Sequence, residues 1–121
     1  MLTITGLKRF YFIPNVNDMR YGYRKLVQIV RNSYGMDSKN GDVFIFMSKS
    51  RRTVKMVNFE NHAYYLHQKT FTRGYNFMRL EFKDHKPVYR IDWKDLMAIL
   101  ETPVINSLKI SSFEGENIDV K

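Results

Sequence analysis

The sequence predicts an α+β domain, in which an antiparallel β-meander of about four to six strands packs against a long N-terminal amphipathic helix and a shorter C-terminal helix. Two segments with apolar residues at helical spacing flank a central region of short apolar and alternating segments, which are typical of strands. A length of 121 residues and a hydrophobic fraction of 44% suffice for one core. We therefore expect a single domain over residues 1–103, followed by a polar, partly loose tail over residues 104–121.

The long helix is predicted over residues 17–35. Its apolar side chains recur every three or four positions, at Met19, Tyr23, Leu26, Val30 and Tyr34. Asn17 or Asp18 is expected to cap the beginning of this helix, and Gly35 to supply the left-handed turn after its end.

A cationic stripe follows the outer side of this helix. Arg20, Arg24 and Arg31 fall within about 40° of one another, because each helical residue advances by about 100°. Gly22 inside the helix would cost about 1 kcal/mol relative to alanine, so we expect another element to approach closely there. The stripe is a candidate contact for an anionic partner.

Extended segments occupy most of the chain between the two helices. A strand over residues 7–13 is expected to precede the first helix and to stop at Pro14. Three further strands are predicted over residues 42–47, 53–59 and 64–71. These three should form an antiparallel meander, because the connections KSRR and ENHA are short enough for hairpins. Residues 76–82 and 87–91 are expected to continue the sheet.

The shorter helix is predicted to begin after Asp92, which is placed to cap it, with Asp95 at the third helical position. One face of this helix is apolar, with Trp93, Leu96, Met97 and Leu100 at positions i, i+3, i+4 and i+7. Pro103 is expected to end the helix.

The positive charge is concentrated in the first two thirds of the chain. Residues 1–79 contain 14 Lys/Arg and 4 Asp/Glu, whereas residues 80–121 contain 6 Lys/Arg and 8 Asp/Glu. Such an excess of cations favours a polyanion, and nucleic acid is the usual one. The alternative is that the charge serves only solubility.

No set of residues predicts an enzyme. The three histidines, His62, His67 and His85, lack a second ligand at a metal-binding spacing, and carboxylates are scarce in the basic region. The chain has no cysteine, no signal peptide and no apolar run of the ~20 residues that span a membrane. We expect a cytoplasmic protein without a catalytic site, a metal or a cofactor.

Cations and aromatic residues alternate in two segments. One contains Lys8, Arg9 and residues 10–12 (FYF), and the other contains Arg73, Tyr75, Phe77 and Arg79. Such clusters can hold phosphates and stack bases. Aromatic residues at every second position of a strand are more often part of the core, so both interpretations stay open at this point.

Three stretches together resemble the TnpB accessory proteins of the insertion-sequence-sixty-six family of bacterial mobile elements. They are Asp18-Met19-Arg20 followed by Gly22, the stretch NGDVFIFMSKSRRTVKMV, and the stretch YYLHQKTFTRG. The resemblance covers roughly residues 8–101. The positions that match the family motif are Asp18, Met19, Arg20, Gly22, Arg51, Arg52, Lys55, Tyr65 and Lys69. The chain departs from the motif at Asn58-Phe59-Glu60, at Thr70 and at residues 77–79.

The resemblance implies a non-catalytic accessory factor for transposition, encoded beside a DDE-type transposase. Its expected partners are DNA, in particular the ends of the insertion sequence, and that transposase. The residues expected to contact DNA phosphates are Arg20, Arg24, Arg31, Lys49, Arg51, Arg52, Lys55, Lys69 and Arg73. Lys55 interrupts an apolar strand, so we expect it to point to solvent beside the arginines of the turn. The alternative is a protein-interaction module that docks on the transposase without binding DNA.

Overall fold

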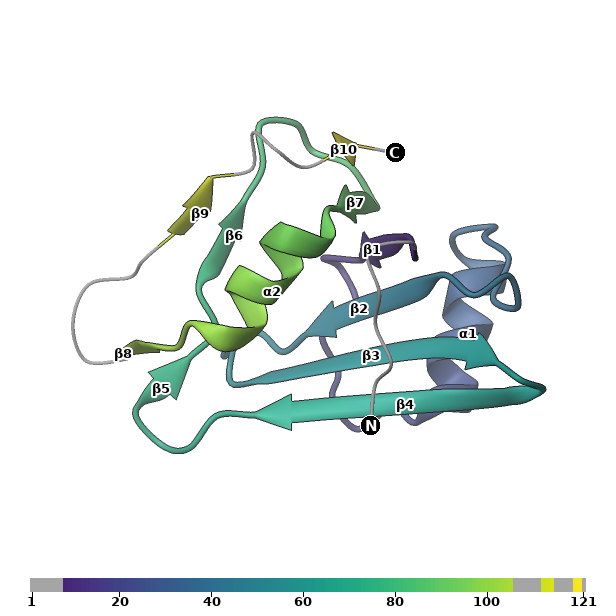
Figure 1. The fold of residues 1–121 in the computed structure, drawn as a ribbon, viewed down its shortest axis with the longest axis horizontal. Coiled ribbons are helices and arrows are strands. Elements are labelled where there is room, and N and C mark those ends of the chain that lie inside the picture. Colours follow the sequence, from purple (N-terminus) through teal and green to yellow (C-terminus); the bar gives the residue numbers. More distant parts are fainter. Residues whose placement is uncertain (1–7, 106–111, 115–118, 121) are drawn as a thin grey trace.

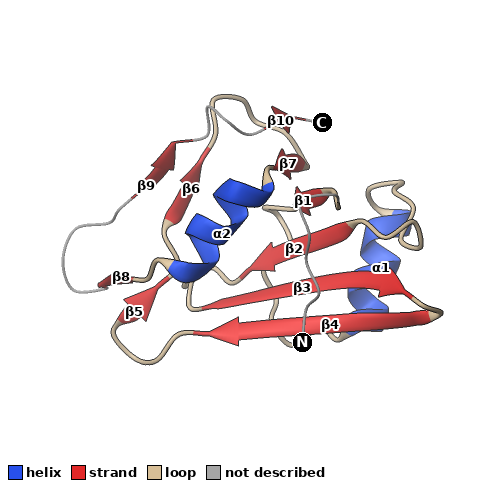
Figure 2. Cartoon of the chain, viewed as in Figure 1, coloured by secondary structure: helices blue, strands red, loops and turns tan. Residues whose placement is uncertain are grey.

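The computed structural model of the chain describes residues 8–105, 112–114 and 119–120. Two helices and a six-stranded sheet form its centre, and two further pairs of short strands lie beside the sheet (Figures 1 and 2). The order of strands in the sheet is β10-β7-β1-β2-β3-β4. The helices are α1 (Tyr23–Asn32) and α2 (Trp93–Glu101). The strands of the sheet are β1 (Phe10–Phe12), β2 (Val43–Met47), β3 (Thr53–Glu60), β4 (Ala63–Thr70), β7 (Tyr89–Ile91) and β10 (Asp119–Val120).

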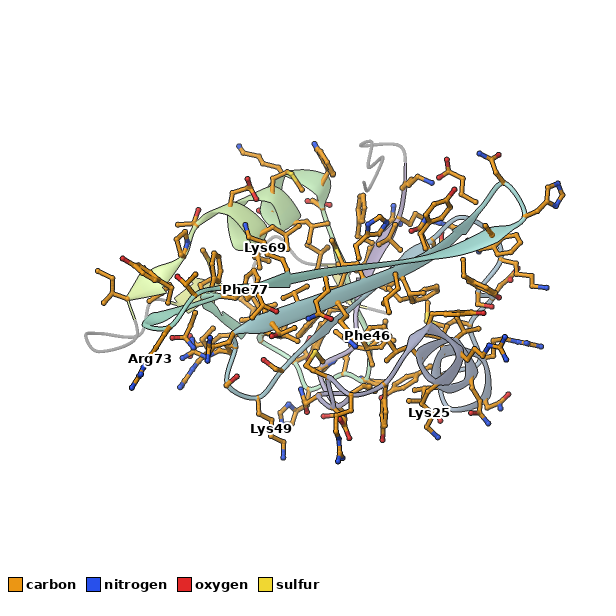
Figure 3. The ribbon with its side chains drawn as sticks, turned by 90° about the horizontal axis from the view of Figure 1, so that it is seen from below. Lys25, Phe46, Lys49, Lys69, Arg73 and Phe77 are labelled. Atoms are coloured by element: carbon orange, nitrogen blue, oxygen red, sulfur yellow. The ribbon has the colours of Figure 1, made fainter. Side chains whose placement is uncertain are left out.

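The sheet separates two apolar cores, one beneath each helix. On one side Leu26 and Val30 of α1 pack with Phe44 and Phe46 of β2. On the other side Leu96, Ile99 and Leu100 of α2 pack over the opposite face of the same strands. Figure 3, which views the sheet edge-on, shows α2 above the sheet and α1 below it. The predicted α+β class, with one sheet and two helices, is confirmed.

The central meander β2-β3-β4 is confirmed as well. Each of these strands pairs antiparallel with the next, with Phe46 opposite Lys55 and Val57 opposite Leu66. Asn61 and His62 join β3 to β4 and both have positive φ values, 52° and 63°. Positive φ at both central residues is the geometry of a two-residue hairpin turn that matches the twist of the flanking strands.

The meander does not extend to β1, which pairs parallel with β2 and antiparallel with β7. This difference from the prediction follows from the position of α1 in the chain. A helix between two neighbouring strands returns the chain to the same end of the sheet, so the two strands run parallel. β1 thereby lies inside the sheet, and all three of its residues are buried.

The prediction of a long first helix was wrong, because α1 has only ten residues and begins at Tyr23 rather than at Asn17. Asn17 does not cap it: its side-chain amide donates to the carbonyls of Pro14, at 3.0 Å, and Met47, at 2.9 Å. Gly22 stands at the N-cap position, in an extended conformation, and not inside the helix. Gly35 has a φ of 62°, which agrees with the predicted left-handed turn.

The second helix begins where the sequence predicted, with Asp92 at the N-cap position, although the Asp92 side chain makes no capping hydrogen bond. The Asp95 carboxylate is half-buried, and that burial, together with the nearby charge of Asp92, raises its pKa. The helix ends at Glu101, two residues before Pro103.

The strands predicted after β4 are only partly in the main sheet. Of residues 87–91, the segment β7 joins the sheet, beside β1 rather than β4. Residues 76–82 are interrupted instead: β5 (Tyr75–Asn76) pairs with β8 (Val104–Ile105), and β6 (Arg79–Glu81) pairs with β9 (Ser112–Glu114). The domain limit at residue 103 and the looseness of the tail stay predictions, since residues 106–111, 115–118 and 121 lie outside the described residues.

Candidate nucleic-acid interface

Exposed cations line the solvent side of α1. Arg24 and Arg31 stand seven residues apart on the helix, and both border a hollow of about 410 Å³ together with Gln28, Lys39 and Tyr64. The Arg24 guanidinium lies 5.8 Å from the centre of the Tyr23 ring, and its Nε donates to the Tyr23 hydroxyl at 3.2 Å. The expected stripe therefore exists, although it contains only Arg24, Gln28 and Arg31 of the predicted helix.

Lys25 and Lys49 lie on the same side of the sheet as α1. Lys49, in the connection between β2 and β3, borders a second hollow together with Ile29 and Ser33 at the end of α1. Figure 3 places Lys25 and Lys49 below the sheet and Lys69 above it. The helix and the β2–β3 connection therefore present cations to one common side, which we call the α1 face and define as Arg24, Lys25, Arg31, Lys39 and Lys49.

The carboxylates near the α1 face are mostly engaged elsewhere. Three of the four acidic residues among residues 8–79 form ion pairs: Glu60 with Lys8 at 2.8 Å, Asp42 with Arg9 at 2.9 Å, and Asp18 with Arg20 at 2.7 Å. Within the described residues, no cation of the α1 face takes part in an ion pair. Its positive charge is therefore left to solvent and to partners.

Arg20 differs from the other predicted arginines of the helix, because it precedes α1 and pairs with Asp18. Its Nε donates to Asp18 Oδ1 at 3.0 Å, and a terminal nitrogen donates to Asp18 Oδ2 at 2.7 Å. The same pairing, helped by the backbone N–H of Arg20, lowers the pKa of Asp18 to about 2. The guanidinium remains 91% exposed, so the pair neutralises its charge without burying it.

The two arginines of the β2–β3 turn bind backbone carbonyls. Arg51 donates from its guanidinium to the carbonyl of Phe77 at 3.2 Å, and Arg52 donates to the carbonyl of Phe71, also at 3.2 Å. Both side chains are half-buried, and burial is the main cause that lowers the pKa of Arg51. The arginines thus tie the turn to the segment that follows β4.

Lys55 corrects a sequence prediction, because it does not point to solvent. The residue is only 7% exposed, and its Nζ donates to the backbone carbonyl of Tyr21 at 2.8 Å. Lys55 lies on the face of β3 that α1 and its preceding loop cover, which the sequence could not show. A lysine can be buried there because its long aliphatic stem packs in the core while the ammonium group reaches a carbonyl at the edge.

Lys69 and Arg73 complete the predicted set. The Lys69 Nζ donates to the carbonyl of Leu100 at 2.6 Å and to Glu101 Oε2 at 3.1 Å, so it serves the end of α2 on the other side of the sheet. Arg73 is exposed in the connection between β4 and β5 (Figure 3). DNA contact by each of these residues stays a prediction.

Sequence reasoning missed Lys25 and Lys39, which are exposed members of the α1 face. Lys25 was outside the predicted stripe, but it lies across the ring of Tyr21 at 5.8 Å. Lys39 belongs to the loop after α1, and its ammonium lies 5.6 Å from the centre of the Phe59 ring. The Asn-Gly pair that follows Lys39 was the only local signal, because a tight turn exposes its neighbours.

Neither a metal site nor a membrane span is found in the part of the chain that the structure describes. No three His, Asp or Glu side chains gather there closely enough to hold an ion. No helix there has both the length and the apolar character needed to cross a bilayer.

The resemblance found in the sequence is tested by comparison with known protein families. The family model described as IS66 Orf2 like protein matches residues 8–109. The chain belongs to the IS66 Orf2-like family. No curated protein and no solved structure matches it significantly. Membership of this family associates the chain with transposition of insertion sequences.

Proposed function

We propose that this IS66 Orf2-like chain is a non-catalytic accessory factor for transposition of a bacterial insertion sequence, and that it binds DNA through the α1 face. The single observation that carries the proposal is that five exposed cations of α1 and its neighbouring loops share one side of the sheet without ion pairs among the described residues. The proposed setting is the bacterial cytoplasm, where the element's DNA and its transposase are found.

The cations of the α1 face are suited to phosphates rather than to base edges. They protrude from a short helix and two loops, and aromatic rings flank three of them, Arg24, Lys25 and Lys39. Contacts to phosphates give affinity and orientation without reading the sequence directly. If all five cations neutralise phosphates, the logarithm of the association constant should fall with the logarithm of salt concentration at a slope of about −4.5.

Fluorescence anisotropy with a duplex from one end of the element, across a salt series, tests this proposal. The Arg24→Ala/Arg31→Ala variant should bind about tenfold more weakly at low salt and should reduce the salt slope by about 2. A wild-type affinity that is weak at low salt, or a slope that the variant leaves unchanged, would contradict DNA binding by this face.

A matched control distinguishes the α1 face from net charge. Arg31→Ala and Lys94→Ala each remove one exposed helix cation that has no ion pair among the described residues, the first on α1 and the second on α2. DNA affinity should fall with Arg31→Ala and should stay within twofold of wild type with Lys94→Ala. Equal losses would mean that only the total charge matters.

Docking on the transposase is a second candidate, and the edge strand β4 favours it. β4 is at the end of the six-stranded sheet, is eight residues long and carries two exposed apolar side chains, Tyr65 (41% exposed) and Leu66 (37% exposed). Long edge strands with apolar side chains are ready to pair with a strand of another chain. We propose a strand of the transposase as that partner.

Co-purification of the two proteins after nuclease treatment tests the second candidate. Leu66→Lys should abolish the complex, because a charge on the edge opposes strand addition. Arg24→Ala/Arg31→Ala should leave the complex intact. A complex that requires DNA, or one that survives Leu66→Lys, would refute docking through β4.

A further inference from the structure

A cleft opens at the C-terminal ends of the parallel strands β1 and β2. Its volume is about 940 Å³, at the upper end of the roughly 300–1,000 Å³ typical of small-molecule sites. Four segments line it: residues 12–17 at and after the end of β1, the β2–β3 turn, strand β6 with Phe82 after it, and residues 85–89, which lead into β7. We call it the basic cleft.

Cations outnumber carboxylates in the lining of the basic cleft. Lys49, Arg51, Arg79 and Lys86 border it, against a single carboxylate, that of Glu81. Within the described residues, none of these five side chains forms an ion pair. The basic cleft therefore contains positive charge that no neighbouring carboxylate neutralises.

Arg51 and Arg79 are the two cations of the cleft whose mutual repulsion an anionic ligand would reduce most. They come from different walls, and Arg79 lies near enough that its charge adds to burial in lowering the pKa of Arg51. Arg51 also has a φ of 59°, a conformation that residues other than glycine adopt uncommonly. Two neighbouring guanidinium groups without a carboxylate between them match a phosphate, which accepts hydrogen bonds from both.

The lining of the basic cleft also contains apolar and aromatic side chains. Leu80 and Phe82 are half-buried there, and the Phe82 ring stacks on Tyr89 with ring centres 3.7 Å apart and planes 7° from parallel. A cleft that brings cations and aromatic side chains together can hold the phosphate and the base of an unpaired nucleotide.

We propose that the basic cleft binds an unpaired nucleotide, with its phosphate between Arg51 and Arg79 and its base against Leu80 and Phe82. Lys49 belongs to the α1 face and also borders the basic cleft, so a frayed or overhanging strand of DNA bound on the α1 face can enter the cleft. That a DNA strand supplies the nucleotide rests on the proposed DNA binding. That the cleft binds a nucleotide does not rest on it.

Arg79 is a better residue for the test than Arg51. Arg51 holds Phe77 twice, since its guanidinium donates to the Phe77 carbonyl and its own carbonyl accepts from the Phe77 N–H at 2.6 Å. Loss of Arg51 would disturb the turn itself. Arg79 is exposed, and its side chain makes no hydrogen bond to another described residue, so Arg79→Ala should remove the phosphate contact and leave the fold intact.

The experiment compares a blunt duplex with the same duplex carrying a single-stranded overhang of a few nucleotides, by fluorescence anisotropy at fixed salt. Wild-type protein should prefer the overhang by about tenfold, which is the gain expected from one stacked base and its phosphate. Arg79→Ala should remove this preference, and Arg24→Ala/Arg31→Ala should weaken both duplexes while keeping it. A wild-type protein without the preference, or a preference that Arg79→Ala leaves unchanged, overturns the strand as ligand.

A second experiment, with a free mononucleotide, distinguishes a DNA strand from a free nucleotide as the ligand of the cleft. It also distinguishes failure of the cleft proposal from failure of DNA binding by the α1 face. Thymidine monophosphate, followed by NMR shifts of backbone amides in residues 48–51 and 79–82, should bind wild-type protein and not Arg79→Ala. Binding of the mononucleotide with no overhang preference identifies a free nucleotide as the ligand, and binding with no duplex affinity overturns only the α1 face. If the mononucleotide gives no shifts and the overhang no preference, the basic cleft is not a nucleotide site.

Glu81→Gln supplies a control of opposite sign in the same cleft. Removal of its carboxylate takes away the only negative charge of the lining, so mononucleotide affinity should rise by about threefold. A fall in affinity would show that Glu81 holds the ligand, for instance through the base, and would overturn the placement of the phosphate between Arg51 and Arg79.

Discussion

The cations at family-motif positions and the cations of the α1 face differ in what they contact. Those that match the motif, Arg20, Arg51, Arg52, Lys55 and Lys69, all bind acceptors inside the molecule: one carboxylate, four backbone carbonyls and, for Lys69, a second carboxylate. Those of the α1 face form no ion pair among the described residues, and all of them are exposed.

This difference indicates which cations of the chain have a structural role and which are exposed to a partner. Apart from Arg20, which pairs with its near neighbour Asp18, the motif cations join segments distant in the sequence. Lys55 joins β3 to the loop before α1, and Lys69 joins β4 to the end of α2. The α1 face supplies exposed charge for the proposed DNA contact, and Arg51 additionally borders the proposed nucleotide cleft.

The largest expected effect is at Lys55. Lys55→Ala should lower the free energy of unfolding by about 3 kcal/mol, because it leaves the Tyr21 carbonyl without its donor and opens a cavity in the core under α1. Urea denaturation measures the loss. Lys55→Met keeps the stem and should cost less. If Lys55→Ala unfolds at the wild-type urea concentration but binds DNA weakly, Lys55 belongs to the interface and the comparison fails.

Arg52→Ala should lower the free energy of unfolding by about 1–2 kcal/mol, since its half-buried guanidinium holds the Phe71 carbonyl. Arg31→Ala, in contrast, should change it by less than about 0.5 kcal/mol, as expected of an exposed substitution. Thermal or urea unfolding and DNA affinity should be measured for both variants. Arg52→Ala should lose stability, whereas Arg31→Ala should lose DNA affinity. The same loss of stability in both would refute the distinction.

Lys69→Ala should cost about 1 kcal/mol, because the ammonium satisfies the Leu100 carbonyl in the last turn of α2 and pairs with Glu101. Amide hydrogen exchange of residues 96–101 locates the effect, which should be confined to the end of the helix. Lys94→Ala, at the other end of α2, serves as the control and should leave this exchange unchanged.

The smallest effect is expected at Arg20, and it depends on pH. The folded-state pKa of Asp18 is about 2, below the ordinary value of 3.8, so the pair stabilises the fold above about pH 4 and this contribution is lost as the pH falls towards 2. In Arg20→Gln the Asp18 pKa, followed by carboxyl ¹³C NMR, should rise towards 3.8. An unchanged midpoint near 2 would show that the backbone N–H alone holds the carboxylate.

The fold was predictable from local patterns and not from long-range pairing. The hairpin β3-β4 follows from alternation and a short connection, and α2 from its apolar spacing before Pro103. The position of β1 between β2 and β7 depends on partners that are up to about 80 residues away, for which the sequence FYF contains no signal. Likewise, the helical spacing of apolar residues extends back to Met19, but the chain before Tyr23 is not helical. Asn17, the expected cap, instead donates from its side-chain amide to the carbonyl of Met47.

Of the candidate site, only its positive charge was predictable from the sequence. The excess of cations in residues 1–79 indicated an anionic partner, and the exposure of Arg24, Arg31 and Lys49 agrees with the predicted placement. Which cations are exposed depends on carbonyls brought near by the fold, as Lys55 and Arg52 show. Residue type and spacing cannot reveal a carbonyl acceptor, because every residue has one.

The insertion of β1 between β2 and β7 has a consequence for the order in which a growing chain can fold. Strands β2, β3 and β4 lie next to one another in sequence and can pair as soon as residue 70 has left the ribosome. The second edge of β1 has no partner until residues 89–91 follow, and α2 covers its face only after that. During that interval an apolar edge strand is exposed to other chains, so a nascent or truncated protein ending before residue 89 should aggregate.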